Sequence, residues 1–402
     1  MRRLTRAFLL IALLSALAPS AGFARTTPLA EAIYRGNVAR TGESPGPGPV
    51  GEPVLLWRFE TAAPVVASAA IADGTLYAGS WDHHFYALDA RTGTERWRFR
   101  ARAGFFSSPT IHDGLAIVGD NAGWLYAIET GSGNLRWSKK LGGPVWSSAV
   151  VVGDTVYVGS VDGALYALDA ATGHERWRQQ VGGTIWSSSP AIAYGMAFIG
   201  GTDAARAGVG FVAALDLASG AERWRREIGG VYNTPAVSGG LVYVNSDWGA
   251  LHALSADTGE ERWRYQPERS GVGSSPSVSG DTVYISGNDG FLHAIDARTG
   301  FPRWRAQYGR ALGSSPVISD ATVYVMSDEG RLVAFDALSG DLRWSFPLDA
   351  DAGSAPVVAD GRVYVGTGQH AIEPTQGLIV SIGGAGLGDQ RPADAAAMIT
   401  AR

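Results

Sequence analysis

The sequence contains no cysteine. This absence excludes disulfide bonds, thiolate metal sites, covalent haem attachment and cysteine catalysis. It also excludes lipidation of an N-terminal cysteine. Positive charge is not in excess, because the formal net charge is −5 and only 18% of the residues are charged. A chain with no basic run is not expected to bind nucleic acid or anionic membranes. The sequence motifs of serine hydrolases, zinc proteases and P-loop NTPases are also missing.

Long apolar runs are scarce as well, and the one at the N-terminus is short. Three arginines precede the apolar run 7–17, and small residues follow up to Ala24. This order predicts a secretory signal peptide over residues 1–24, cleaved near Ala24. The alternative is an uncleaved anchor helix. Cleavage would remove three arginines and no acid, so the net charge of −5 would become −8. We therefore expect a soluble periplasmic or secreted protein, with no transmembrane segment in the mature chain.

Tryptophan, in contrast, is abundant, with 13 residues, and eight of them recur at a nearly constant spacing. The eight are Trp57, Trp97, Trp137, Trp177, Trp224, Trp263, Trp304 and Trp344. Their successive separations are 40, 40, 40, 47, 39, 41 and 40 residues. A fixed period of this length is typical of a repeat architecture. The 54 glycines and 19 prolines suit many short strands joined by tight turns.

Each repeat predicts four strands, which we name A to D in chain order. Residues 147–178 show the unit clearly, with β-branched and aromatic runs separated by turn pairs such as Thr-Gly. Seven complete units run from 66 to 345, and an eighth supplies strands A to C from 354 to 380. Residues 55–59 have the pattern of a D strand with no A to C before it. The sequence therefore predicts an all-β, eight-bladed propeller, closed when the N-terminal strand completes the last blade and removes its open edge.

We interpret the eight periodic tryptophans as structural docking residues. A buried indole removes roughly 200 Å² from water, and its N–H can reach a backbone carbonyl of a neighbouring blade. The expected organisation is a signal peptide over 1–24, a lead-in and Pro/Gly-rich linker over 25–54, the propeller over 55–383 and a disordered tail over 384–402.

The pattern Ala-x-Asp-x-x-Thr-Gly-x-x-x-Trp, found at 87–97 and 167–177, resembles the tryptophan-docking motif of the pyrroloquinoline-quinone (PQQ)-type propellers. The resemblance covers residues 55–383, and residues 34–42 also resemble the lead-in of such repeat proteins. It weakens at 129–133, at Ser255 and in the eighth blade. That family includes quinoprotein alcohol dehydrogenases and the outer-membrane assembly factor BamB. The resemblance implies a propeller, but it assigns no functional residue.

Function in a repeat protein is expected where the repeats differ, and they differ most in the D–A connections and B–C turns. These segments should share one face. Four consecutive blades begin strand A with Phe106, Trp146, Trp186 and Tyr232, whereas three others have Gly273, Gly313 and Gly353. This predicts an aromatic half-ring at the mouth of the central channel, opposite an open half. The B–C turns add Trp81, His83, His84, Trp124, Asp247 and Trp248. The alternative is that the aromatic residues only plug the channel.

The histidines give weaker signals. His83 replaces a turn glycine and should have a positive φ. His252 and His293 fill a strand C position that holds tyrosine in other blades, so we interpret them as packing variants. His83, His84 and His370 could meet Asp82 at a metal, but the sequence shows no preset three- or four-ligand set. We predict no metal site and no catalytic residue.

Three functions fit these features. The first is a non-catalytic, BamB-like interaction or scaffolding module, whose partner is a protein or peptide such as the envelope assembly machinery. The second is a quinoprotein dehydrogenase, in which PQQ would stack on Trp146 or Trp186. Family dehydrogenases carry an adjacent-cysteine disulfide and calcium-binding inserts, whereas this chain offers only an Asn245–Asp247 pair. The third is a glycan-binding or polysaccharide-processing propeller, for which the acids are scattered at Asp120, Asp203, Asp247 and Glu373. We favour the first and predict no cofactor.

Overall fold

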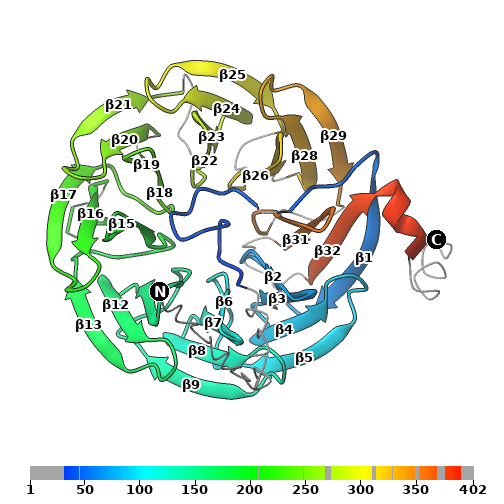
Figure 1. The fold of residues 1–402 in the computed structure, drawn as a ribbon, viewed down its shortest axis with the longest axis horizontal. Coiled ribbons are helices and arrows are strands. Elements are labelled where there is room, and N and C mark those ends of the chain that lie inside the picture. The colour runs from blue at the N-terminus through cyan, green and yellow to red at the C-terminus, as the bar shows by residue number, and fades with distance from the viewer. Residues whose placement is uncertain are drawn as a thin grey trace, which may run out of the picture.

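The computed structural model describes residues 31–44, 46–203, 205–206, 208–247, 249–267, 273–309, 314–327, 329–348, 353–368 and 376–390. The predicted signal peptide, Trp248, Gly313, His370 and Glu373 lie outside these residues. The chain forms a closed ring of eight four-stranded antiparallel sheets (Figure 1). The predicted all-β, eight-bladed propeller is confirmed. No helix in the described ranges is long and apolar enough to span a membrane.

The first four blades follow one another along the chain. Blade 1 contains β2 (Ala70–Ala72), β3 (Thr75–Gly79), β4 (His84–Asp89) and β5 (Glu95–Arg100). Blade 2 contains β6 (Thr110–His112), β7 (Leu115–Gly119), β8 (Trp124–Glu129) and β9 (Leu135–Lys140). Blade 3 contains β10 (Val150–Val152), β11 (Thr155–Gly159), β12 (Ala164–Asp169) and β13 (Glu175–Gln180). Blade 4 contains β14 (Ala191–Ala193), β15 (Met196–Thr202), β16 (Gly210–Asp216) and β17 (Glu222–Ile228).

The next three blades repeat the pattern, and the last one differs. Blade 5 contains β18 (Ala236–Ser238), β19 (Leu241–Asn245), β20 (Leu251–Ser255) and β21 (Glu261–Tyr265). Blade 6 contains β22 (Ser277–Ser279), β23 (Thr282–Ser286), β24 (Phe291–Asp296) and β25 (Pro302–Gln307). Blade 7 contains β26 (Val317–Ser319), β27 (Thr322–Met326), β28 (Arg331–Asp336) and β29 (Leu342–Pro347). Blade 8 contains β30 (Val357–Ala359), β31 (Arg362–Gly366), β32 (Gly377–Gly384) and β1 (Pro53–Thr61).

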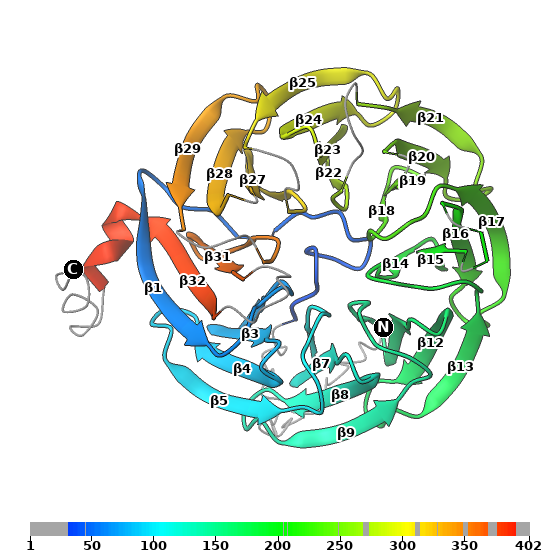
Figure 2. The same ribbon diagram turned by 180° about the vertical axis from the view of Figure 1, so that it is seen from behind.

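The N-terminal strand closes the ring, as predicted. β1 pairs antiparallel with β32, with Val54 opposite Gly383 and Phe59 opposite Ile379. Figure 2 shows the two strands side by side, next to the C-terminal end. The expected disordered tail begins with an ordered element, because residues 385–390 form the 3-10 helix η1 (Ala385–Gln390). Its first amide donates to the carbonyl of Glu52 at 3.1 Å, so the tail starts against β1.

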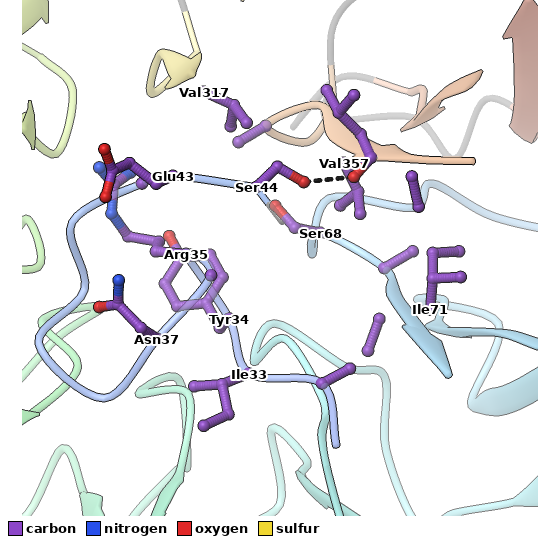
Figure 3. A pocket seen from close by; sticks show the side chains of 18 of the residues that line it. Ile33, Tyr34, Arg35, Asn37, Glu43, Ser44, Ser68, Ile71, Val317 and Val357 are labelled. Carbon is purple, nitrogen blue, oxygen red and sulfur yellow. Dashed lines mark hydrogen bonds between the residues drawn. The ribbon is translucent and has the colours of Figure 1, made fainter. Parts of the chain in front are cut away.

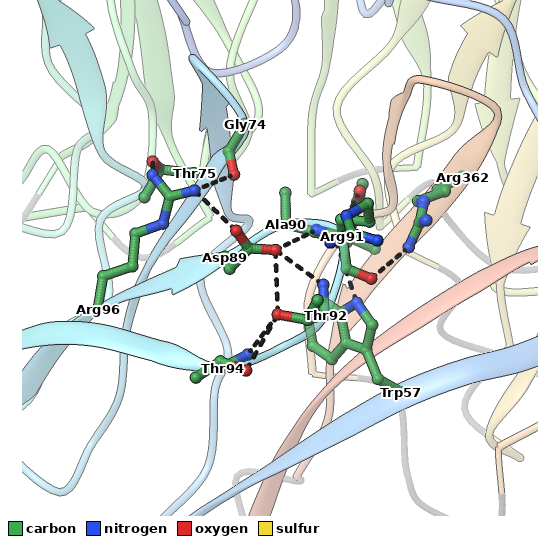
Figure 4. Close-up of polar contacts among 11 residues, drawn as sticks. Trp57, Gly74, Thr75, Asp89, Ala90, Arg91, Thr92, Thr94, Arg96 and Arg362 are labelled. Carbon is green, nitrogen blue, oxygen red and sulfur yellow. Dashed lines mark hydrogen bonds and ion pairs between the residues drawn. The ribbon is translucent and has the colours of Figure 1, made fainter. Parts of the chain in front are cut away.

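Seven of the eight periodic tryptophans contact the C–D turn of the following blade, and Figure 4 shows this contact for Trp57. The Trp57 indole N–H donates to the carbonyl of Ala90 at 3.1 Å. The ring lies on Gly93, where an added Cβ would be 2.7 Å from indole carbon. Asp89 of the same turn accepts bonds from Thr92 and from Arg96. The same approach of indole to turn glycine recurs at Trp97–Gly133, Trp137–Gly173, Trp177–Gly220, Trp224–Gly259, Trp263–Gly300 and Trp304–Gly340. A side chain on these glycines would push the blades apart.

His252 and His293 occupy the predicted tyrosine position of strand C. His293 pairs with Ile285 across the sheet, as Tyr166 pairs with Val158 in blade 3. Both histidine rings are buried. His293 Nε2 lies 3.1 Å from Asp289 Oδ2, and His252 Nδ1 lies 2.8 Å from a carboxylate oxygen of Glu261. The interpretation as packing variants is confirmed.

These two histidines should make the stability depend on pH. Burial lowers the pKa of both rings below the usual 6.5. Below pH 6.5 the unfolded chain therefore binds more protons at these two rings than the folded chain does, and stability is lost as the pH falls. Two histidines can contribute at most about 2.7 kcal/mol per pH unit to this slope. Urea unfolding between pH 7.5 and 5.5 measures it.

The variant His293→Tyr measures how much of this pH dependence comes from one of the two histidines. In His293→Tyr the new hydroxyl can reach Asp289, as Tyr166 reaches Asp162, and one titrating group is gone. The slope should fall to about half of the wild-type value. An unchanged slope in this variant would show that His293 does not carry the effect.

Candidate functional site

The segment before the first strand crosses one end of the central channel. Figure 1 shows it in blue, passing over the centre of the ring. We call residues 31–44 the lead-in segment. It bonds to the second residue of strand A in blades 2, 4, 5, 6 and 7, through Ala32–Ile111, Val38–Ile192, Ala39–Val237, Thr41–Val278 and Gly42–Ile318. Because strand A runs from the D–A connections towards the A–B turns, the segment closes the channel on the A–B face. No pattern in the sequence predicts this closure.

Two buried arginines fix the lead-in segment inside the channel. The Arg40 side chain is fully buried and donates to the carbonyls of Tyr34, Ser148, Ala149 and Pro190, at 2.6 to 3.1 Å. Arg35 donates through Nη2 to the carbonyl of Pro276 and to Ser277 Oγ. Burial lowers the pKa of Arg35, and it lowers that of Arg40 to about 9, so Arg40 remains charged at neutral pH.

A cavity of about 420 Å³ lies between the lead-in segment and blades 7, 8 and 1 (Figure 3). Its wall is largely apolar and includes Ile33, Ile71, Val317 and Val357. Ser44 crosses one side and donates to the carbonyl of Val358. This cavity is on the A–B face, where the repeats are most alike.

The opposite end of the channel carries a continuous aromatic arc, which consists of Trp81, Phe106, Trp146 and Trp186. The ring centroids are 4.6 Å apart for Trp81–Phe106, 5.1 Å for Phe106–Trp146 and 5.1 Å for Trp146–Trp186. All four side chains are half-buried. The structure thus brings together four of the residues that the sequence assigned to the channel mouth.

Polar anchors hold two of the three indoles of the arc, those of Trp146 and Trp186. Trp146 Nε1 donates to Asn121 Oδ1 at 2.6 Å, and Trp186 Nε1 donates to Thr202 Oγ1 at 3.1 Å. With their N–H groups bound, the indoles can offer ring faces and edges to a ligand at a small cost in entropy. Tyr232 follows in the next blade, is 43% exposed, and accepts a bond from Ser187 through its carbonyl.

The remaining candidates from the B–C turns lie outside the arc. His83 has a φ of 71°, which confirms the predicted strained turn. His84 Nδ1 lies 3.4 Å from Asp82, and the Arg102 guanidinium covers the Trp124 ring at 4.5 Å. Asp247 is tied through its amide to the carbonyl of Gly230 at 2.8 Å. Trp248 lies outside the described residues.

An axial cavity of about 250 Å³ separates the aromatic arc from the lead-in segment. Phe106 and Trp146 line it on one side, Gly273 and Gly353 line it on the other, and Tyr34 of the lead-in segment reaches it from the A–B face. The rest of the wall consists mainly of serines. The channel is therefore narrow but hollow beneath the arc.

Two acidic residues near the channel mouth, Asp120 and Asp203, already have hydrogen-bond or ion-pair partners within the protein. Asp120 is buried and accepts bonds from the Trp124 amide and the Tyr126 hydroxyl, each at 2.8 Å. Asp203 pairs with Arg206 at 2.7 Å. Within the described ranges, no group of three or more His, Asp or Glu side chains could hold a metal ion. These residues do not form the oxygen-rich site that calcium requires, nor a free pair of carboxylates.

A family model and a solved structure of BamB both match most of the chain. The family model of the outer membrane protein assembly factor BamB matches residues 54–184, 123–208, 179–315 and 288–377. Among solved structures, BamB from Moraxella catarrhalis is 19% identical, with a TM-score of 0.69, covering 83% of this chain and 100% of that one. No curated protein sequence matches significantly.

Two quinohemoprotein alcohol dehydrogenases share the same fold. The enzyme from Comamonas testosteroni is 15% identical with a TM-score of 0.74, and ADHIIG from Pseudomonas putida is 17% identical with a TM-score of 0.75. Each match covers 90% of this chain and 81% of the enzyme. At these identities the structural likeness establishes the propeller fold alone.

Proposed function

The chain belongs to the family of the outer membrane protein assembly factor BamB, and on that premise we propose that it is a non-catalytic protein-interaction module. Its binding surface is the aromatic arc together with Tyr232. The ligand is an extended polypeptide segment of a partner. The observation that carries this proposal is the unbroken contact of Trp81, Phe106, Trp146 and Trp186 at the end of the channel opposite the lead-in segment.

The chemistry of the arc supports a polypeptide ligand. Half-buried aromatic rings held by their own hydrogen bonds lose little entropy when a ligand packs on them, and such residues dominate binding energy at protein interfaces. The sequence of the N-terminus supports export through a signal peptide. We therefore propose a periplasmic location and a partner within the envelope assembly machinery.

The dehydrogenase alternative does not fit the donor set. The sequence has no cysteine for a disulfide against the cofactor. Asn245 donates to the carbonyl of Ser274, and Asp247 is not joined by further acids into a metal-binding group in the described part of the chain. We therefore assign no PQQ-dependent reaction to this chain.

Photo-cross-linking from the two faces tests the proposal. A benzophenone side chain replaces Tyr232 beside the arc in one variant and Tyr194 in the other. Tyr194 is 60% exposed and lies in an A–B turn on the opposite face. The probe is carboxymethylated α-lactalbumin, which is permanently unfolded. Cross-linking from position 232 should exceed that from position 194 by about tenfold, as expected for a site with micromolar affinity. Equal yields from both faces would overturn the proposal.

A further inference from the structure

A ring of hydroxyl groups surrounds the channel directly beneath the aromatic arc. We call it the hydroxyl ring, and it consists of Ser68, Ser108, Ser148, Ser189, Thr234, Ser275 and Ser315. The backbone amides of the first six members each donate to the hydroxyl oxygen of the member in the next blade, at 2.8 to 3.1 Å. The series stops at blade 8, where Ala355 takes the place of a serine.

The protons of these hydroxyls have no acceptor in the protein as far as the structure describes it. Each bond within the ring uses a hydroxyl oxygen as acceptor, and none of the seven hydroxyls donates to a described residue. Ser68, Ser108, Ser148 and Ser315 line the axial cavity. Ser107, which directly precedes Ser108 in the chain, is different. Its hydroxyl donates to the Gly119 carbonyl and also accepts from the Gly119 amide. The hydroxyl ring therefore presents unused donors to the axis.

Uncompensated positive charge lies next to these donors. Arg40 binds the carbonyls of Ser148 and Pro190, and Arg35 binds that of Pro276, so both guanidinium groups touch the backbone at or directly after ring members. Neither makes an ion pair with a carboxylate of the described chain, and Glu43 accepts its bond from Thr41 instead. Arg35 Nη1 is buried and has no hydrogen-bond partner.

Hydroxyl donors that line a small cavity, with two guanidinium groups bound to the backbone of its wall, favour a negatively charged acceptor. We propose that the axial cavity binds a small oxyanion of the carboxylate or phosphate class. Its oxygens accept from the hydroxyl ring, and Arg35 and Arg40 stabilise its charge from the side of the lead-in segment. About 250 Å³ accommodates such an ion.

Titration calorimetry of the full chain tests this site with sodium acetate and with inorganic phosphate, at constant ionic strength set by sodium chloride. The matched variants are Ser108→Ala and Ser107→Ala. Each removes a hydroxyl that accepts one backbone amide, but only Ser108 has a free proton that faces the cavity. Ser108→Ala should weaken anion binding by about fivefold, and Ser107→Ala should leave it within about twofold. Ala355→Ser adds an eighth donor and should strengthen binding.

Each possible result of this titration either supports or overturns the proposed anion site. Saturable binding at one site per chain supports the proposal, and the tighter of the two ions identifies the carboxylate or the phosphate class. Equal binding of neutral acetamide, equal effects of the two serine variants, or no heat with either anion would overturn it. The assay contains no protein partner, so its failure would leave the proposed polypeptide site untouched.

Discussion

Replacing Trp146 and Trp186 together with alanine should lower the affinity for an unfolded polypeptide about 100-fold and change the melting temperature by less than about 3 °C. Truncating an aromatic residue that contributes to an interface costs more than about 1 kcal/mol, and a loss of about 1.4 kcal/mol from each ring sums to about 2.8 kcal/mol, which corresponds to 100-fold. The melting temperature should change little because both rings are half-exposed at the mouth. Fluorescence anisotropy with labelled carboxymethylated α-lactalbumin and scanning calorimetry provide the two measurements.

Trp137→Ala is the matched control. Trp137 is 9% exposed, contacts the turn of the next blade at Gly173, and donates to the Ala170 carbonyl at 2.9 Å. This variant should lose about 3–5 kcal/mol of stability and keep the affinity of whatever fraction stays folded. If the double variant at the mouth instead loses stability to the same extent as Trp137→Ala, the arc plugs the channel and is not a binding surface.

Arg40→Ala should destabilise the protein by about 3–5 kcal/mol, because it removes the donor to four carbonyl oxygens and leaves them unsatisfied inside the channel. The melting temperature should fall by roughly 5–10 °C. Urea unfolding and scanning calorimetry measure both quantities.

Arg40→Lys distinguishes the contribution of the positive charge to stability from that of the planar guanidinium group. Lysine keeps the positive charge but lacks the planar fork that reaches Tyr34, Ser148 and Pro190 at the same time. We expect this variant to recover about half of the stability that Arg40→Ala loses. A loss below about 1 kcal/mol in Arg40→Ala would show that the lead-in segment is not fastened by this side chain.

Much of the fold could be predicted because its determinants are local and repeated. Tryptophans at a period near 40 and turn pairs between β-branched runs specify four strands per blade, and the unpaired strand at 53–61 has only one partner that closes the ring. The positive φ of His83 and the packing role of His293 follow from the same register, since each occupies a position whose chemistry other blades reveal. The mouth residues Phe106, Trp146 and Trp186 stood out for the converse reason, because they break the repeat.

The tertiary structure alone decided what fills the axis. No periodicity connects residues 34–42 with strands hundreds of residues away, so the burial of Arg35 and Arg40 inside the channel depends on contacts between distant parts of the chain. The pairing of Trp81 with Phe106 joins two different blades and follows from ring closure. The hydroxyl ring has the same origin. A serine in one repeat looks like a small residue at a crowded axis, and only the convergence of the blades brings Ser68, Ser108, Ser148 and Ser315 to one cavity with their protons unused.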